Sequence, residues 1–120
     1  MTSFLLPYPP SVNRIYRIFK NRLIKSAEYK AWIDEAHKAL LMQGTQRRCW
    51  TSPVMVEAAV GRPDRRKRDL DNVFKATADL MEAAGLVEND HLIHAWNVYW
   101  SEDVTNGVLV TIMPMPAEAA

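Results

Sequence analysis

GRPDRRKRDLDNVFKATADLMEAAG, which occupies residues 61–85, sets the densest positive charge of the chain directly before a pair of carboxylates. Five of the seven residues from Arg62 to Arg68 are basic, and Asp69 and Asp71 follow them at once. Exposed ion pairs contribute only about 0–1 kcal/mol each, so stability is a weak reason for this arrangement. A ligand that needs charges of both signs is a stronger reason.

The same stretch predicts how the chain folds around it. From Val54 to Val60, apolar side chains alternate with other residues, which indicates a strand with one buried face that runs into the basic loop. Asp69 is the expected N-cap of a helix that ends at Gly85. The core-facing side of this helix is expected to carry Leu70, Val73, Phe74, Thr77, Leu80, Met81 and Ala84. Its opposite face carries Asp71, Lys75, Asp79 and Glu82.

The remaining elements follow on either side of this unit. Residues 3–6 predict a short strand that ends at Pro7, and residues 26–44 predict an amphipathic helix with Ser26 as N-cap. Residues 92–100 and 108–113 are expected to pair as a hairpin through the turn at Asn106–Gly107. The order strand, helix, strand, helix, strand, strand predicts an α+β fold. We expect a single small domain over residues 1–120, with a mixed or antiparallel sheet, two packed helices and a frayed tail at 114–120.

A second basic segment, residues 13–25, contains no acid. Its cations are Arg14, Arg17, Lys20, Arg22 and Lys25, and they are interleaved with Ile15, Tyr16 and Phe19. Two interpretations are open. The segment is either a mobile basic loop beside nucleic acid, or a strand pair whose long cationic side chains extend over the core.

Charge is unevenly distributed along the chain. Residues 1–68 hold fourteen Lys or Arg and five Asp or Glu, a net charge of +9, whereas residues 69–120 hold one Lys and nine acids, a net charge of −8. This asymmetry favours a nucleic-acid-binding face beside an acidic patch. The alternative is two solvated halves that attract each other.

Other features of the composition limit the location of the protein. Cys49 is the only cysteine, which excludes an internal disulfide and a thiolate zinc site and suits a reducing compartment. We expect its thiol to be buried or half-buried. No run of about 18 apolar residues is present for a membrane span, and the N-terminus does not resemble a signal peptide. The sequence therefore predicts a cytoplasmic protein with no membrane partner.

Three carboxylates are candidates for a metal site. Asp69 and Asp71 stand at the start of the second helix, and a chain that returns to a neighbouring strand is expected to bring Asp90 to them. Converging carboxylates repel one another unless a hard cation such as Mg²⁺ lies between them. Lys75, one turn after Asp71, is expected to balance this cluster or to stabilise charge on a scissile phosphate.

A structural interpretation of the same residues also exists. Asp69 and Asp71 suit the N-terminus of a helix on capping and dipole grounds alone, and Asp71, Lys75 and Asp79 form an i, i+4 ladder typical of exposed helices. The cations before them favour phosphodiester chemistry, because metal-assisted cleavage needs the phosphate held next to the carboxylates.

Three motifs in this sequence resemble the RusA family of Holliday junction endodeoxyribonucleases. They are PPSVNRIYR at 9–17, PDRRKRDLDN at 63–72 followed by Lys75, and GLVEND at 85–90. One departure lies in the last motif, where the family's acidic doublet is Asn89–Asp90. The second position of the doublet is retained as Asp90, whereas the first is the amide Asn89 in place of an acid.

The resemblance implies a homodimeric enzyme, often phage or prophage encoded, that acts in the cytoplasm of a bacterial host in DNA recombination and repair. It implies cleavage of four-way DNA junctions with Mg²⁺, for which Mn²⁺ can substitute. By motif, the essential aspartates fall on Asp69, Asp71 and Asp90, and the important lysine falls on Lys75. The expected DNA-backbone contacts are Arg14, Arg17, Arg62, Arg65, Arg66, Lys67 and Arg68. Together these residues define a basic–acidic site segment at 62–75 and a basic loop at 13–25.

Two other functions are compatible with the residues alone. A non-enzymatic phage DNA-binding or packaging accessory protein would use the same basic loop, with the aspartates serving only as helix caps. A metal-dependent phosphatase or nucleotide hydrolase would use the carboxylates, but the many cations outside the acidic cluster favour a polymeric substrate. For a dimer, the terminal hairpin or the first helix is the expected interface, with Trp96 and Trp100 as candidate contacts.

Overall fold

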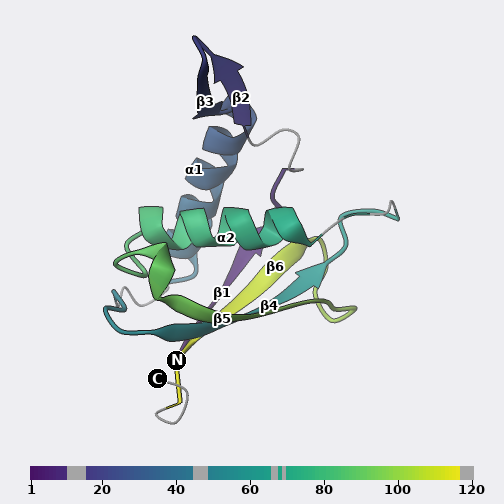
Figure 1. The fold of residues 1–120 in the computed structure, drawn as a ribbon. Coiled ribbons are helices and arrows are strands. Elements are labelled where there is room, and N and C mark those ends of the chain that lie inside the picture. The colour runs from purple at the N-terminus through teal and green to yellow at the C-terminus, as the bar shows by residue number, and fades with distance from the viewer. Residues whose placement is uncertain (11–15, 45–48, 66–67, 69, 117–120) are drawn as a thin grey trace.

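Residues 1–10, 16–44, 49–65, 68 and 70–116 are described by the structure, a computed structural model, with residues 16–19 and 23 described at the backbone only (Figure 1). The elements are β1 (Thr2–Pro7), β2 (Tyr16–Phe19), β3 (Arg22–Lys25), α1 (Ala27–Met42), β4 (Val54–Gly61), α2 (Asp71–Ala83), the 3₁₀ turn η2 (Asp90–Leu92), β5 (Ile93–Trp100) and β6 (Gly107–Pro114).

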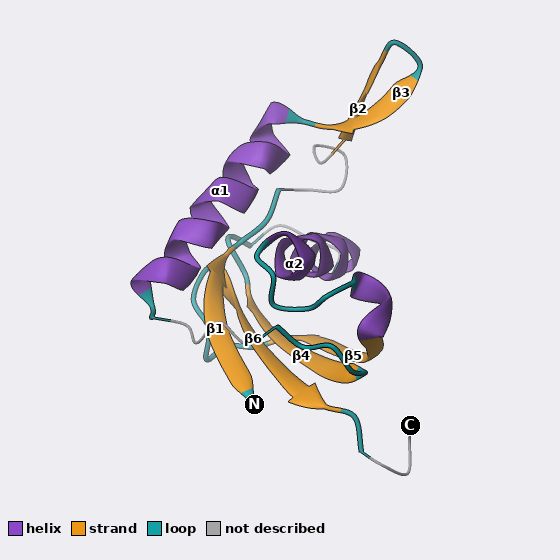
Figure 2. Ribbon diagram, turned by 90° about the vertical axis from the view of Figure 1, so that its left-hand side faces the viewer, coloured by secondary structure: helices purple, strands orange, loops and turns teal. Residues whose placement is uncertain are grey.

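Four of the strands form one mixed sheet in the order β1-β6-β4-β5. β6 pairs antiparallel with both β1 and β4, whereas β4 pairs parallel with β5. Both helices lie on one face of this sheet (Figure 2), and the core lies between the helices and that face. The α+β fold with a mixed sheet and two packed helices is thus confirmed.

The predicted hairpin of the last two strands is wrong. β4 lies between β5 and β6, so the segment that follows β5 must cross the end of β4 before β6 begins. Neighbouring strands are about 4.8 Å apart, so this segment crosses about 10 Å. Gly61, the last residue of β4, permits the crossing, because a Cβ at this position would lie 2.1 Å from the carbonyl oxygen of Val104.

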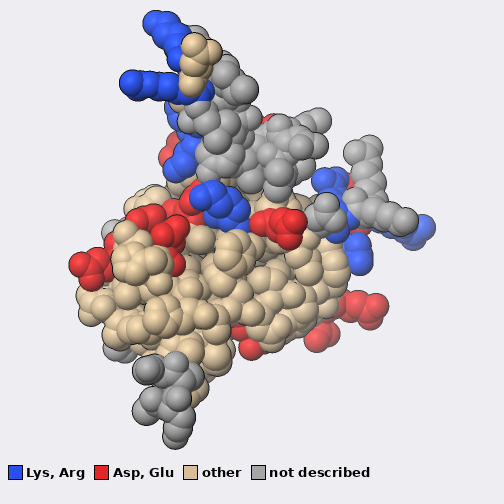
Figure 3. All heavy atoms as spheres, viewed as in Figure 1, with Lys and Arg blue, Asp and Glu red and all other residues tan. Residues whose placement is uncertain are grey.

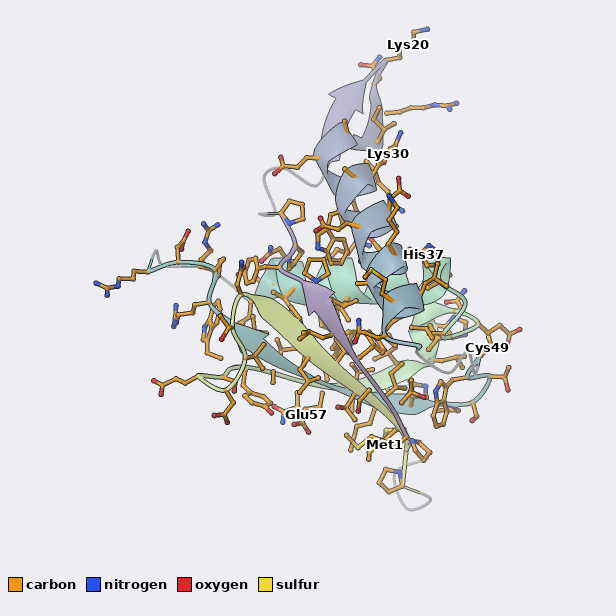
Figure 4. The ribbon with its side chains drawn as sticks, turned by 180° about the vertical axis from the view of Figure 1, so that it is seen from behind. Met1, Lys20, Lys30, His37, Cys49 and Glu57 are labelled. Carbon is orange, nitrogen blue, oxygen red and sulfur yellow. The ribbon has the colours of Figure 1, made fainter. Side chains whose placement is uncertain are left out.

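The basic segment contains the hairpin β2–β3, which is absent from the predicted order of elements. Its strands pair antiparallel, and Lys20 and Asn21 take positive φ values of 50° and 61°, as a two-residue turn with the twist of a hairpin requires. The hairpin projects from the start of α1, with Lys20 at its tip (Figure 4). The strand-pair interpretation is therefore correct, but the hairpin stands away from the core instead of covering it.

Helix α1 begins at its predicted cap and is tied to the first strand. The Ser26 hydroxyl oxygen accepts a hydrogen bond from the Tyr29 N–H at 3.1 Å. At the other end, the Gln43 side-chain amide pairs with both the N–H and the carbonyl of Leu5, each at 2.7 Å. These bonds occupy backbone groups on the outer edge of β1, which would otherwise be open to pairing. The Trp32 indole N–H donates to the Pro7 carbonyl at 3.0 Å.

Helix α2 follows the predicted range but differs at two places. It begins at Asp71, after Leu70 in the N-cap position with helical φ and ψ, and the predicted cap Asp69 lies outside the described residues. Phe74, predicted to face the core, is 42% exposed. Because β5 is an edge strand, the Phe74 side of α2 extends past the sheet, where its ring packs on that of Trp96 with centroids 4.4 Å apart.

Cys49 is exposed, so the prediction of a buried thiol is wrong. The next residue, Trp50, is buried and bridges to the segment that follows α2. Its backbone N–H donates to the Leu86 carbonyl at 2.8 Å. Successive side chains of an extended segment point in opposite directions, so an inward Trp50 turns Cys49 outward.

No helix in the described part of the chain has the length and apolar character that crossing a membrane requires.

Candidate functional site

The loop between β4 and α2 holds two of its described cations, Arg62 and Arg68, by specific contacts. The Arg62 guanidinium lies over the Trp100 ring, 4.1 Å from its centroid. Arg68 donates two hydrogen bonds to Asp64, from Nη2 at 2.6 Å and from Nε at 3.3 Å. Arg65 is exposed. Such exposed pairs add little stability, so their main effect is to hold the guanidinium groups in defined positions.

Arg68 also borders a groove of about 630 Å³ between this loop, the end of β1 and α1. The hydrogen bond to Asp64 raises the pKa of Arg68. Tyr8 lines the same groove, and burial raises the pKa of its hydroxyl against the opposing effect of Arg68. Within the described chain, that hydroxyl is buried and has no hydrogen-bond partner. The groove thus combines a fixed cation with a neutral phenol.

Helix α2 carries Asp71 exposed in its first turn, where the helix dipole favours negative charge. The next residue, Asn72, is only 5% exposed, and its Nδ2 donates to the Pro10 carbonyl at 2.6 Å. This bond joins the PPS segment to the DLDN segment. Sequence reasoning missed Asn72, although an amide next to the buried Val73 was the available signal for a buried hydrogen bond.

The structure places Asp90 at the opposite end of α2 from Asp71. Because β4 and β5 are parallel, α2 runs back along the sheet between them, and η2, which begins at Asp90, lies near the end of α2 (Figure 1). A helix of 13 residues spans about 20 Å. One chain therefore does not bring Asp90 to Asp71, contrary to the expected return path.

Asp69, the third predicted ligand, lies outside the described residues. Among the residues that the structure describes, no three His, Cys, Asp or Glu side chains are grouped so that they could hold a metal ion. Asp71 and Asp90 are both exposed carboxylates, which are the hard oxygen ligands that Mg²⁺ prefers. The donor chemistry suits a divalent cation, but the described donors of one chain do not converge on one.

Lys75 is half exposed and pairs with Asp79, with Nζ 3.3 Å from Oδ1. Of the other predicted DNA contacts, Arg14, Arg66 and Lys67 lie outside the described residues. Arg17 lies in β2, where only the backbone is described.

Cationic side chains gather on two projections of the molecule (Figure 3). One is the hairpin β2–β3, with Lys20 and Arg22 exposed, and the other is the loop after β4, with Arg62 and Arg65 exposed. Acidic side chains gather over the far end of α2. The uneven charge of the sequence is therefore also uneven in space.

An apolar surface adjoins Asp71 along the edge formed by α2 and β5. A groove of about 300 Å³ is lined by Leu70, Asp71, Phe74 and Val98, and Trp96 lies against Phe74. Trp96 and Trp100 both face the helix-covered side of the sheet, opposite Val56 and Val60 of β4, and are partly buried there. We call Leu70, Phe74, Trp96 and Val98 the edge patch.

The fold and site define a small α+β protein that carries cationic projections beside exposed carboxylates. Residues 7–113 match the family model described as endodeoxyribonuclease RusA. The chain therefore belongs to the RusA family, as its three motifs indicated.

Individual relatives agree with this assignment. A crossover junction endodeoxyribonuclease RusA of Escherichia coli strain K12 is 39% identical over 92 residues, which cover 73% of this chain and 72% of the relative. The protein of that name in E. coli O139:H28 strain E24377A is 37% identical over 100 residues, 80% of this chain and 79% of the relative. The one in Enterobacteria phage 82 is 40% identical over 86 residues, 71% and 70% of the two chains.

The bond between Asn72 and Pro10 leads to a prediction about stability. Replacing Asn72 by Ala leaves the part-buried Pro10 carbonyl without this donor, so the free energy of unfolding in urea is expected to fall by about 0.5–1.5 kcal/mol. The matched control is Thr77→Val on the same helix. The Thr77 hydroxyl is buried without a partner in the described structure, so this change is expected to be neutral or stabilising. Equal losses of unfolding free energy in both variants would show that the Asn72–Pro10 hydrogen bond does not stabilise the fold.

Proposed function

We propose that this protein is a crossover junction endodeoxyribonuclease that hydrolyses phosphodiester bonds of four-way DNA junctions with Mg²⁺ or, as a substitute, Mn²⁺. Membership of the RusA family supports this proposal, as do the activities that the names of its relatives give. The observation that carries it is the exposed Asp71, which follows directly on the loop that holds Arg62, Arg65 and Arg68. Crossover junctions, which the relatives' names specify, favour a role in DNA recombination and repair, and the occurrence of these relatives in E. coli and in a phage favours the bacterial cytoplasm as the location.

The separation of Asp71 from Asp90 makes the proposed metal site a property of two chains. If Asp69, Asp71 and Asp90 share one ion, Asp90 must come from a second copy, because α2 keeps the two ends of one chain apart. A two-fold axis across the middle of the α2–β5 edge would place the Asp71 end of each subunit against the Asp90 end of the other. Such a homodimer has two equivalent sites.

The edge patch supports this arrangement of the dimer. Leu70, Phe74, Trp96 and Val98 lie beside Asp71 on the α2–β5 edge, and Phe74 is 42% exposed. Exposed aromatic residues are enriched at the centres of interfaces. Two-fold pairing of this edge would bury the patch and complete both sites at once, and two sites suit paired nicks in strands related by symmetry.

In the proposed mechanism, a divalent cation, when bound, would supply the activation of water for phosphodiester hydrolysis and would neutralise charge on the phosphate. Asp69 and Asp71 of one subunit and Asp90 of the partner subunit are the proposed ligands. The Lys75 ammonium, one turn beyond Asp71, stabilises the negative charge that develops on the phosphate. The DNA backbone is bound by cationic side chains, which recognise shape and charge instead of bases. These are Arg62, Arg65, Arg66, Lys67 and Arg68, with Arg14 and Arg17.

The first test of this proposal concerns the cations. Replacing Arg62, Arg65 and Arg68 together by Gln is expected to weaken junction binding in EDTA and to flatten its salt dependence. Each lost phosphate contact lowers the log–log slope by up to about 0.9. Lys30→Gln, which changes an exposed cation on α1, is the control. A triple variant with wild-type affinity and slope would show that this loop is only solvated.

The second test separates catalysis from helix capping. Asp71→Asn keeps the size of the side chain but removes its charge, and the lost dipole interaction costs only about 0.3–1 kcal/mol. We expect the fold and junction binding in EDTA to persist, and Mg²⁺-dependent cleavage to fall by orders of magnitude. Asp90→Asn is expected to behave alike.

The control for this test is Asp34→Asn on α1. This change removes an exposed charge that is distant in sequence from Asp71 and Asp90. Cleavage at the wild-type rate by Asp90→Asn under saturating Mg²⁺ would contradict the three-carboxylate site. It would favour a protein that binds DNA through the basic loop and uses these aspartates structurally.

A further inference from the structure

A buried tyrosine connects the two helices beside the proposed site. Tyr29 of α1 is fully buried, and its hydroxyl donates to Oδ2 of Asp79 on α2 at 2.5 Å. Its ring stacks with that of Trp32 at a centroid distance of 6.1 Å and an interplanar angle of 8°, and its N–H is bonded to the Ser26 cap. The hydroxyl is therefore a donor in a fixed position.

Asp79 uses its other oxygen to hold Lys75. Oδ1 lies 3.3 Å from Nζ of Lys75, and the Asp79 side chain is only 10% exposed, against 48% for that of Lys75. A carboxylate this deeply buried needs partners, because its desolvation is costly. The tyrosine hydroxyl and the ammonium supply one contact to each oxygen.

Lys75 has two acids within reach on its own helix, because Asp71 stands four residues before it and Asp79 four residues after it. On an isolated helix, the pair with the acid on the N-terminal side is the more favourable, which would direct Lys75 to Asp71. Within the described structure, the ion pair is instead made with Asp79. Charges attract more strongly where water is excluded, and Tyr29 fixes the Asp79 carboxylate in such a place.

We propose that Asp79, held by Tyr29, is a positioning residue for Lys75. It keeps the ammonium one turn from Asp71, close enough to meet a phosphate there, and it prevents a direct Lys75–Asp71 pair that would occupy an oxygen needed as a ligand. This inference rests on the proposed function, because it assigns a task to Asp79 and Tyr29 through the role of Lys75.

A purely structural role for the same contacts predicts a different result. If Tyr29 and Asp79 only tie α1 to α2, their loss lowers stability and affects cleavage whether or not Lys75 is present. If they act through Lys75, their loss has no further effect once Lys75 is gone. A double-mutant cycle separates the two roles.

The test uses Asp79→Asn, Lys75→Ala and the double variant, with single-turnover cleavage of a four-way junction at saturating protein and Mg²⁺. Asparagine still accepts from Tyr29 but does not attract the ammonium. We expect Asp79→Asn to slow cleavage by about 10- to 100-fold, as for a misplaced catalytic group, with junction affinity in EDTA unchanged. In the Lys75→Ala background it is expected to change the rate by less than about twofold. Glu82→Gln, on the same exposed face of α2, is the matched control.

A second readout does not depend on cleavage. In the metal-free and DNA-free protein labelled with ¹⁵N-lysine, the Lys75 ammonium is expected to give a protected NMR signal, which Asp79→Asn removes. Tyr29→Phe retains the ring and its stacking, so it is expected to weaken this signal and slow cleavage by several fold even if Asp79→Asn does not fold.

Three results would overturn the inference. In the first, Asp79→Asn and Tyr29→Phe cleave at the wild-type rate while Lys75→Ala cleaves more slowly. This result removes the positioning role and leaves the proposed function intact. Multiplicative losses in the double variant assign Tyr29 and Asp79 to stability alone. Wild-type cleavage by Lys75→Ala removes the catalytic role of Lys75 itself, and the positioning role with it.

Discussion

The parallel pairing of β4 with β5 determines where α2, Asp71 and Asp90 lie on the sheet. Parallel neighbours need a crossover, and α2 supplies it by running back across the sheet. The helix then starts where β4 ends and finishes where β5 begins, so Asp71 and Asp90 stand at opposite ends of one unit. The same pairing leaves β5 as an edge strand, with the edge patch beside Asp71 and its Phe74 ring exposed.

Interactions from distant parts of the chain hold this unit and its charges in place. Asn72 binds the Pro10 carbonyl, Arg62 stacks on Trp100, and Tyr29 reaches across to Asp79. Each contact joins α2, or the loop before it, to a segment far away in the sequence. Residues close to the exposed charges are thus tied to the scaffold, as a preorganised site requires.

Local patterns in the sequence predicted the elements but not their partners. The alternation from Val54 to Val60 and the Ser26 cap identified β4 and α1, because burial and capping act within a few residues. The position of β6 between β1 and β4 depends on long-range pairing, which no turn signal at Asn106–Gly107 encodes. Helical periodicity likewise predicted a buried Phe74. The prediction failed because periodicity does not reveal that β5, on which Phe74 packs, is an edge strand. The place of Asp90 was missed for the same reason, since it depends on β4 and β5 being parallel.

A composite site shared by two subunits is tested most directly by a mixed dimer. Asp71→Asn and Asp90→Asn subunits with different affinity tags are co-expressed, and the dimer that carries both tags is purified and given a four-way junction with Mg²⁺. If each site takes Asp71 from one subunit and Asp90 from the other, this dimer retains one intact site and nicks one strand, whereas both parent dimers are inactive. If each chain forms its own site, every site in the mixed dimer carries one substitution, and an inactive mixed dimer would contradict the two-chain site.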